Sequence, residues 1–246
     1  MKKIFFAVSL AAASMAANAS VTTFDDNAMN LVGAADMTDG SIQMVKRGAS
    51  GGAAWLTSPV STANSFDVNF AFSLKSSGSF PMADGITFAL QNGGTDVLGQ
   101  NGGNLGYNGL GAVGSVIQTW YNNTAGLNID GNAYHTQSAP ANLGRANLVT
   151  GTENVKYDAA NHTLSMTGTL LVDGTSHAIR DLKEINLATK FGSTMNMGFT
   201  GASGGSYSDE RITSFSVSAV PEPETYAMLL AGLGLMGFMS RRRKNS

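Results

Sequence analysis

The chain has 246 residues, of which 43% are hydrophobic and 30 are glycine, and it contains no cysteine, which excludes disulfide scaffolds, thiol catalysis and cysteine-based zinc sites. Its formal net charge is −2, but residues 20–219 carry nine basic and fifteen acidic side chains, a net charge of −6. These scattered cations argue against nucleic acid as a partner, because phosphate contacts need clustered positive charge.

The first residues have the order of a secretory signal peptide. Lys2 and Lys3 precede an apolar run over 4–13, and small residues follow, with an A-x-A pattern at 17–19. A buried first helix would instead carry polar residues at helical spacing. We therefore predict a signal helix over 1–19 that is removed by cleavage after Ala19.

Short stretches of alternating apolar and polar residues follow, separated by turns rich in Gly and Asn. The clearest spans 65–74, where the apolar residues at 66, 68, 70, 72 and 74 share one face of a strand. Further strands are predicted at 86–90, 115–121, 163–172, 195–200 and 212–217, and a helical turn within 181–190. Many short strands with such turns are typical of a β-sandwich or jelly roll.

Several of these segments form a collinear set with recognisable motifs. They are residues 31–35, 42–44, 53–60, 66–74, 82–90 (MADGITFAL), 102–107 (GGNLGY), 197–205 (MGFTGASGG) and 212–217. In this order they resemble the L-type, legume-lectin-like lectin domain, whose motifs include ADGxAFxL and GGxLGY. The resemblance covers nearly all of residues 20–219. It implies an all-β, concanavalin-A-type jelly-roll sandwich that binds carbohydrate.

Asp84 is the main candidate for contact with a sugar. A carboxylate in a loop before a buried strand can accept hydrogen bonds from two sugar hydroxyls, and such charge-assisted bonds are strong. The resemblance also implies a cis Ala83–Asp84 peptide held by a neighbouring metal. The simpler alternative is an Asp that caps the turn before Gly85. The predicted sugar-contacting residues are Asp84, Gly103, Asn122 and Ser203, with Tyr107, Tyr121 or Tyr207 available for stacking.

The metal motif matches the family only in part. The family has an acidic-x-Asp-x-aromatic-x-Asn strand, then an Asp and, five residues later, a His. The best register here gives Val116, Gln118, Trp120 and Asn122, then Asp130 and His135, so both strand carboxylates are missing.

The residues that remain in the motif disfavour a transition-metal site. Calcium needs six to eight oxygens, and only weak calcium binding is predicted, with the donors drawn from Gln118, the Trp120 carbonyl, Asn122 and Asp130, next to His135. A register shifted by one residue makes Thr119 and Asn123 the equivalents instead. Trp120 as a core residue and His135 as an ordinary loop histidine remain the simpler alternatives.

The C-terminal residues have three parts in a fixed order. VPEPET begins at Val220, an almost wholly apolar run covers 226–240, and a basic cluster covers 241–244. A helix of that run would be roughly 22 Å long, short of a ~30 Å hydrocarbon core, and its cations would stay on the cytoplasmic side.

This order resembles the PEP-CTERM sorting signal of Gram-negative bacteria. The resemblance implies transient anchoring in the inner membrane, recognition and cleavage by an exosortase, and release to the cell surface or the extracellular matrix. The alternative is a simple C-terminal membrane anchor.

Together these features predict three parts: a signal peptide (1–19), a lectin-like β-sandwich (20–219) and a sorting tail with a short apolar helix (220–246). An enzyme is disfavoured, because glycosidases on this jelly roll need paired acids. Here Asp209 and Glu210 are adjacent and would point to opposite faces of a strand. The predicted function is binding of an exopolysaccharide or surface glycan. The alternative is a non-binding structural component of the cell surface or matrix.

Overall fold

The computed structural model describes residues 28–46, 48, 50–78, 81–120 and 122–220. The predicted signal peptide lies outside these residues, and so does the sorting tail after Val220. Within the described ranges, no helix is long and apolar enough to cross a membrane.

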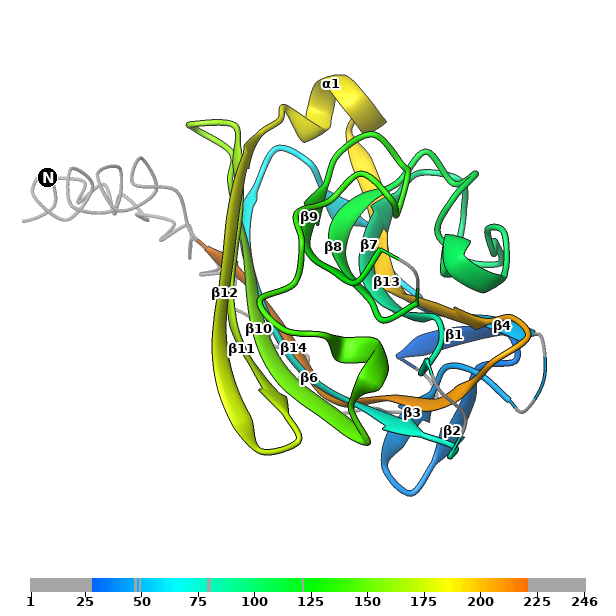
Figure 1. Ribbon diagram of the computed structural model, residues 1–246. Helices are drawn as coiled ribbons and strands as arrows, with labels where there is room; N and C mark the ends of the chain where they lie inside the picture. The colour runs from blue at the N-terminus through cyan, green and yellow to red at the C-terminus, as the bar shows by residue number, and fades with distance from the viewer. Residues whose placement is uncertain (1–27, 47, 49, 79–80, 121, 221–246) are drawn as a thin grey trace, which may run out of the picture.

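Two antiparallel β-sheets lie face to face and form the domain (Figure 1). The front sheet contains, in spatial order, β1 (Met29–Gly33), β4 (Ser50–Leu56), β13 (Thr194–Ser203), β7 (Gly85–Gln91), β8 (Val113–Gln118) and β9 (Thr124–Asn128), with β5 (Val60–Ser61) paired to β13. The back sheet contains β12 (Thr175–Glu184), β11 (Thr163–Val172), β10 (Leu148–Asp158), β6 (Ser65–Ser76), β14 (Ser208–Val220), β3 (Ser41–Gln43) and β2 (Asp36–Thr38). Strands that are distant in the chain are neighbours in space, and the all-β sandwich prediction is confirmed.

The predicted strands agree with the structure in their centres and differ at some ends. β11 covers the predicted 163–172, whereas β8 ends at Gln118, short of the predicted 121. The Thr119 amide still donates to the Asp84 carbonyl at 2.9 Å, in the register of the β7–β8 pairing. Residues 181–184, predicted within a helical turn, belong to β12 because that strand pairs with β11 over its full length. The helix α1 covers only Leu187–Phe191. Two 3-10 turns, η1 (Gly102–Asn104) and η2 (Leu143–Arg145), lie in loops.

The core lies between the sheets and follows the alternation of β6. All five apolar side chains predicted to share one face of this strand are buried. Rings from both sheets meet there, with Phe70 5.8 Å from Phe88 and 5.2 Å from Phe199, and Phe199 5.2 Å from Phe215. Such aromatic pairs add about 0.5–1.5 kcal/mol each beyond the area they bury. The core therefore gives the loops at the sandwich ends a rigid support.

A second buried cluster lies on the outer side of the front sheet. Its members are Ala53, Trp55, Ala89, Leu105, Tyr107, Ala112, Val116 and Ala133. The Trp55 indole donates to the Val97 carbonyl at 2.9 Å, which ties the long loop between β7 and β8 to the sheet. This cluster holds η1, with the two glycines of the predicted site, against the front sheet.

Candidate functional site

The loop that enters β7 is held by backbone hydrogen bonds from two sides. The Asp84 amide donates to the Ala202 carbonyl at 3.1 Å, and the Thr119 amide donates to the Asp84 carbonyl at 2.9 Å. The Ala83–Asp84 peptide is cis, as the resemblance implied. The loop therefore lies between β13 and the end of β8, and its position is set by both strands.

Glu210 lies beneath this loop and contacts it directly. Gly85 has a φ of 129°, and a β-carbon there would collide with the Ile117 carbonyl, so only glycine fits. Its amide donates to Glu210 Oε1 at 3.0 Å. The Ser208 hydroxyl lies 2.9 Å from both that oxygen and the Ala83 carbonyl. These contacts connect Glu210 on β14 directly to Gly85 and, through Ser208, to Ala83.

Burial raises the pKa of Glu210 well above its usual range. The hydrogen bonds from Ser208 and Gly85 lower it, while the charges of Asp84 and Asp209 raise it further. Asp209, next to it in the chain, faces the other side of β14 and pairs with Arg211 at 2.9 Å. The opposite orientation predicted for these two acids is therefore confirmed.

The Asp84 side chain has an acceptor that no protein group satisfies. The residue is only 3% exposed, and its Oδ2 has no hydrogen-bond partner. Burial raises the pKa of Asp84 to about 6, against the lowering effect of the Gly204 amide. A β-carbon on Gly204 would lie 3.3 Å from Oδ2, and one on Gly102 would lie 3.8 Å away. Asp84 thus faces two glycines from separate loops.

Gly103, the next residue in η1, lies between two polar side chains. Gln118 Nε2 donates to its carbonyl at 2.6 Å, whereas Gln118 Oε1 is buried without a partner. On the other side, a β-carbon on Gly103 would collide with the Tyr134 hydroxyl. Burial, and then the charge of Asp84, raise the pKa of Tyr134. Three loops and the end of β8 therefore bring Asp84, Gly103, Gln118 and Tyr134 together.

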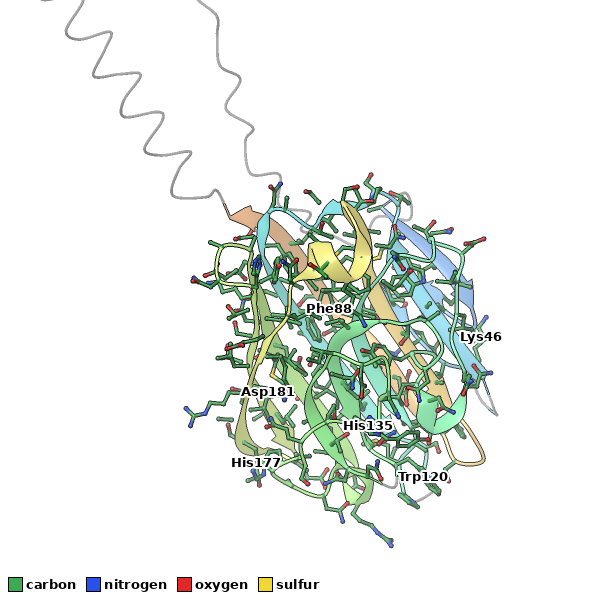
Figure 2. All side chains as sticks on the ribbon, turned by 90° about the horizontal axis from the view of Figure 1, so that it is seen from above. Lys46, Phe88, Trp120, His135, His177 and Asp181 are labelled. Carbon is green, nitrogen blue, oxygen red and sulfur yellow. The ribbon has the colours of Figure 1, made fainter. Side chains whose placement is uncertain are left out.

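The remaining predicted sugar contacts differ in what their side chains already do. The Ser203 hydroxyl is buried and donates to the Gly48 carbonyl at 2.6 Å, so this loop faces Asp84 with the Gly204 amide instead. Asn122 is half-buried, and its backbone amide donates to the Trp120 carbonyl at 2.7 Å. Trp120 is half-buried, and Figure 2 shows it at the edge of the sandwich, away from Phe88 in the core.

Two of the three tyrosines proposed for stacking can be assessed. Tyr107 is wholly buried, with its hydroxyl 3.0 Å from the Ala112 carbonyl and 2.9 Å from Asn128 Oδ1, so the stacking role predicted for it is wrong. Packing against the second cluster places it under the loop rather than at the surface. Tyr207 is half-buried near Ser77, whose hydroxyl donates to its carbonyl at 2.9 Å. Tyr121 lies outside the described residues.

Asp130 and His135, the last two residues of the predicted metal set, bond to each other. His135 Nδ1 lies 2.6 Å from Asp130 Oδ2, and Asp130 Oδ1 accepts from Asn128 Nδ2 at 2.7 Å and from the Asn132 amide at 3.0 Å. Partial burial raises the pKa of Asp130, but these hydrogen bonds outweigh it and hold the pKa below its usual range. The loop therefore closes on itself.

The donor set does not fit a calcium or transition-metal ion. Val116 packs in the second cluster, and Gln118 has its amide group on Gly103. In the shifted register, Asn123 uses its side chain to hold the loop at Ala141 and Leu143, at 2.6 Å each. Among the described residues, no three His, Asp or Glu side chains lie close enough to hold a metal. One carboxylate already paired with His135 is too little for a cation that needs six to eight oxygens.

Sequence reasoning missed Glu210 as a loop anchor and Tyr134 as a neighbour of Gly103. A signal existed for each. Glu210 and Ile212 are two positions apart, so strand alternation puts the acid on the buried face with Ile212, where a carboxyl group needs partners. Tyr134 is an aromatic residue within a loop of otherwise small or polar residues, where a ring has no core to fill.

Comparisons with known proteins agree with this geometry. The family profile described as the legume lectin domain matches residues 17–228, and the PEP-CTERM protein-sorting motif matches residues 219–244. Among solved structures, peanut lectin with a nine-residue peptide superposes with a TM-score of 0.70 at 22% identity, over 83% of this chain and 98% of that one.

Two further structures give similar values. The lectin from Bauhinia forficata in complex with GalNAc has a TM-score of 0.69 at 19% identity, over 83% of this chain and 99% of that one. The metal-free form of lectin I-B4 from Griffonia simplicifolia has a TM-score of 0.68 at 20% identity, over 82% of this chain and 99% of that one. At these identities the likeness establishes the fold.

Proposed function

The chain belongs to the legume lectin domain family, and we propose that it binds carbohydrate at the cluster formed by Asp84, Gly103, Gln118 and Tyr134. The observation that carries this proposal is the unpartnered, buried Oδ2 of Asp84, which faces the glycines at 102 and 204. An acceptor without a donor in a buried site costs free energy unless a ligand supplies the donor. A sugar hydroxyl is such a donor.

The surroundings of Asp84 favour a polyhydroxylated ligand. Glycines let a ring approach the backbone closely, and the Gly204 amide already directs a donor toward the carboxylate. Two half-buried aromatic residues are available to a sugar ring: Tyr134, which belongs to the site, and Trp120, which follows Gln118 by two positions in the chain. Because Oδ2 has almost no solvent-accessible surface in this structure, a sugar reaches it only when neighbouring side chains shift. The Bauhinia forficata relative is bound to GalNAc, and we propose the same class of ligand, neutral sugars of a surface glycan or exopolysaccharide.

Binding, rather than hydrolysis, is the chemistry that this site favours. A glycosidase needs two acids that both reach the substrate. Glu210 contacts the Asp84 loop, but it is fully buried, and one of its oxygens is bonded to Gly85 and Ser208. It therefore supports the loop from below.

The test of binding is a charge-removing substitution with a matched control. Asp84→Asn keeps the shape but replaces an acceptor with a donor, and the loss of two charge-assisted bonds should weaken glycan binding by about 2–4 kcal/mol, roughly 30- to 1,000-fold. Asp96→Asn, an exposed change in the loop between β7 and β8, should bind as the unchanged protein does. The measurement is a glycan array followed by titration calorimetry.

Two outcomes would contradict the proposal. Equal binding by Asp84→Asn and the unchanged protein would place the site elsewhere. No binding to any glycan by either form would favour a structural component of the surface or matrix.

The chain also carries a PEP-CTERM sorting motif, which indicates export and exosortase recognition. We propose that residues 1–19 and a C-terminal part of 220–246 are removed, that the tail anchors the chain transiently in the inner membrane, and that the domain between them reaches the cell surface or the medium. Intact-mass measurement of the extracellular form tests this proposal. A stable extracellular form that still contains Arg241–Lys244 would contradict it.

A further inference from the structure

The loop at Asp84 is held entirely by protein groups at the positions that define its path. The Met82 carbonyl accepts from the Thr119 hydroxyl at 2.9 Å, and the Ala83 carbonyl has the Ser208 hydroxyl at 2.9 Å. Asp84 uses both backbone groups, and the Gly85 amide bonds to Glu210. Each of these backbone groups already has a protein partner, so none of them depends on a cation.

The glycine loop facing it is also held by a side chain. Gln118 reaches it with an N–H, at 2.6 Å from the Gly103 carbonyl. An amide can donate this bond, whereas a carboxylate, an acceptor when ionised, would repel the carbonyl. Gln118 is wholly buried, and its other amide atom, Oε1, has no partner in the structure. Gln118, which was predicted to bind a metal, therefore holds the Gly102–Asn104 turn in place instead.

We propose that Glu210 and Gln118 are positioning residues of a carbohydrate site that is assembled without a divalent cation. Glu210 fixes the Asp84 loop from β14, and Gln118 fixes the Gly102–Asn104 turn from β8. Only the experiment that measures glycan binding rests on the proposed function, because loop assembly can be measured without any sugar.

The first experiment compares the purified, processed protein in chelator with the same protein in 1 mM CaCl2 or MnCl2. Thermal unfolding should change by less than about 1 °C, whereas a site of micromolar affinity would raise the melting temperature by roughly 10 °C. The amide hydrogen of Gly85 should exchange slowly with solvent in the presence of chelator, as measured by NMR. A large, metal-reversed fall in melting temperature, or fast exchange at Gly85 in chelator, would overturn the proposal.

The second experiment tests Glu210 by a pair of variants. Glu210→Gln keeps an acceptor for the Gly85 amide and should preserve slow exchange there. Glu210→Leu removes the acceptor and should speed Gly85 exchange. If the leucine variant does not fold, the glutamine variant still decides, because loss of protection at Gly85 in a folded Glu210→Gln protein contradicts anchoring by an uncharged acceptor.

The third experiment tests Gln118 against a matched glutamine in the same sheet. Gln91 is also buried at the end of a front-sheet strand, and its Nε2 donates to the Gly94 carbonyl at 2.6 Å. Gln118→Glu and Gln91→Glu each remove one amide donor to a glycine carbonyl, so both should lower the melting temperature at pH 8. Only Gln118→Glu should weaken binding of the array-identified glycan, by about tenfold or more, with and without calcium.

Equal affinity for these two variants, or normal binding by Gln118→Glu that requires calcium, would overturn the role of Gln118. Absence of glycan binding by the unchanged protein would contradict the proposed function. The chelator and exchange measurements would still decide how the loops are assembled.

Discussion

The Asp84 loop and the loop from Asp130 to His135 were both predicted to contribute to one ligand site, and they are held in opposite ways. The first is tied to buried groups on β13 and β14, including Glu210 beneath it, and to Thr119 after β8. The second is closed by its own side chains, and its Asp130–His135 hydrogen bond is exposed, with 51% of the Asp130 side chain and 61% of the His135 side chain accessible. Hydrogen bonds to buried strands thus hold the Asp84 loop, whereas the polar groups of the Asp130–His135 loop bond to one another.

The two loops show that the ADG loop and the metal-binding residues, which occur together in the family, need not occur together here. In the family, the metal residues and the ADG loop go together, whereas here the loop is kept and the donors of the metal set do not fit an ion. A loop whose amides and carbonyls are satisfied by rigid strands needs no further support. A carboxylate paired with a neighbouring imidazole has little affinity left for a cation.

The largest expected effect comes from a buried carboxyl group that anchors no loop. Glu153 on β10 points into the core, where the Ser115 hydroxyl donates to its Oε2 at 2.6 Å and Oε1 has no partner. Burial raises the pKa of Glu153 to about 7, against the lowering effect of that hydrogen bond. Glu153→Gln should therefore stabilise the protein by about 3 kcal/mol above pH 7, measured by denaturant unfolding.

The sign of this effect follows from proton linkage. Below the unfolded pKa of Glu153 both states are protonated, so the carboxyl group carries no ionisation penalty and the variant should gain little. As pH rises toward 7, the unfolded chain ionises first, and the folded state loses stability relative to it. A gain that is the same at pH 4 and pH 8 would contradict the prediction. Unchanged Gly85 exchange in this variant would distinguish Glu153 from Glu210.

An intermediate effect is expected where the second loop begins. Asn128, at the end of β9, accepts from the Gly131 amide and contacts the buried Tyr107 hydroxyl at 2.9 Å. Burial, and then the charge of Asp130, raise the pKa of Tyr107, so its proton is held. Tyr107→Phe should cost about 1–3 kcal/mol, because the hydroxyl bonds to the Ala112 carbonyl and to Asn128 Oδ1 are both lost from a buried site. Chemical denaturation measures it, and a change below the error of the method would show that the loop does not depend on this contact.

The smallest effect is expected at the exposed hydrogen bond between Asp130 and His135. Asp130→Asn should change stability by less than about 1 kcal/mol, since solvent screens a pair that is half exposed. Because the pKa of Asp130 is lowered on folding, the contribution of its charge is present above the unfolded pKa and is lost as pH falls through the folded one. Urea unfolding at pH 7 and pH 3 checks both points. A loss of several kcal/mol would mean that this loop is as tightly coupled to the core as the Asp84 loop.

The amino-acid sequence by itself determined the sandwich and the place of Asp84. Alternation along residues 65–74 predicted a strand with one buried face, since side chains on a strand alternate between faces whatever the partner strand is. The family resemblance that the ADG motif carries implied a cis peptide before Asp84, and the structure contains it. The alternation and the ADG motif are both local in the sequence, so the strand and the resemblance could be identified without knowing which strands pair.

Tertiary structure alone decided which groups meet at Asp84. Glu210 contacts Gly85, which is 125 positions away in the chain, because β14 passes behind the loop. Gln118 contacts Gly103, 15 positions away, from β8, which lies beside β7. Tyr107 belongs to a lectin-like motif yet is buried, because the second cluster forms only when its loop folds back on the front sheet. Burial and hydrogen-bond partners depend on which residues pack together in the folded protein, so the spacing of residues along the chain does not predict them.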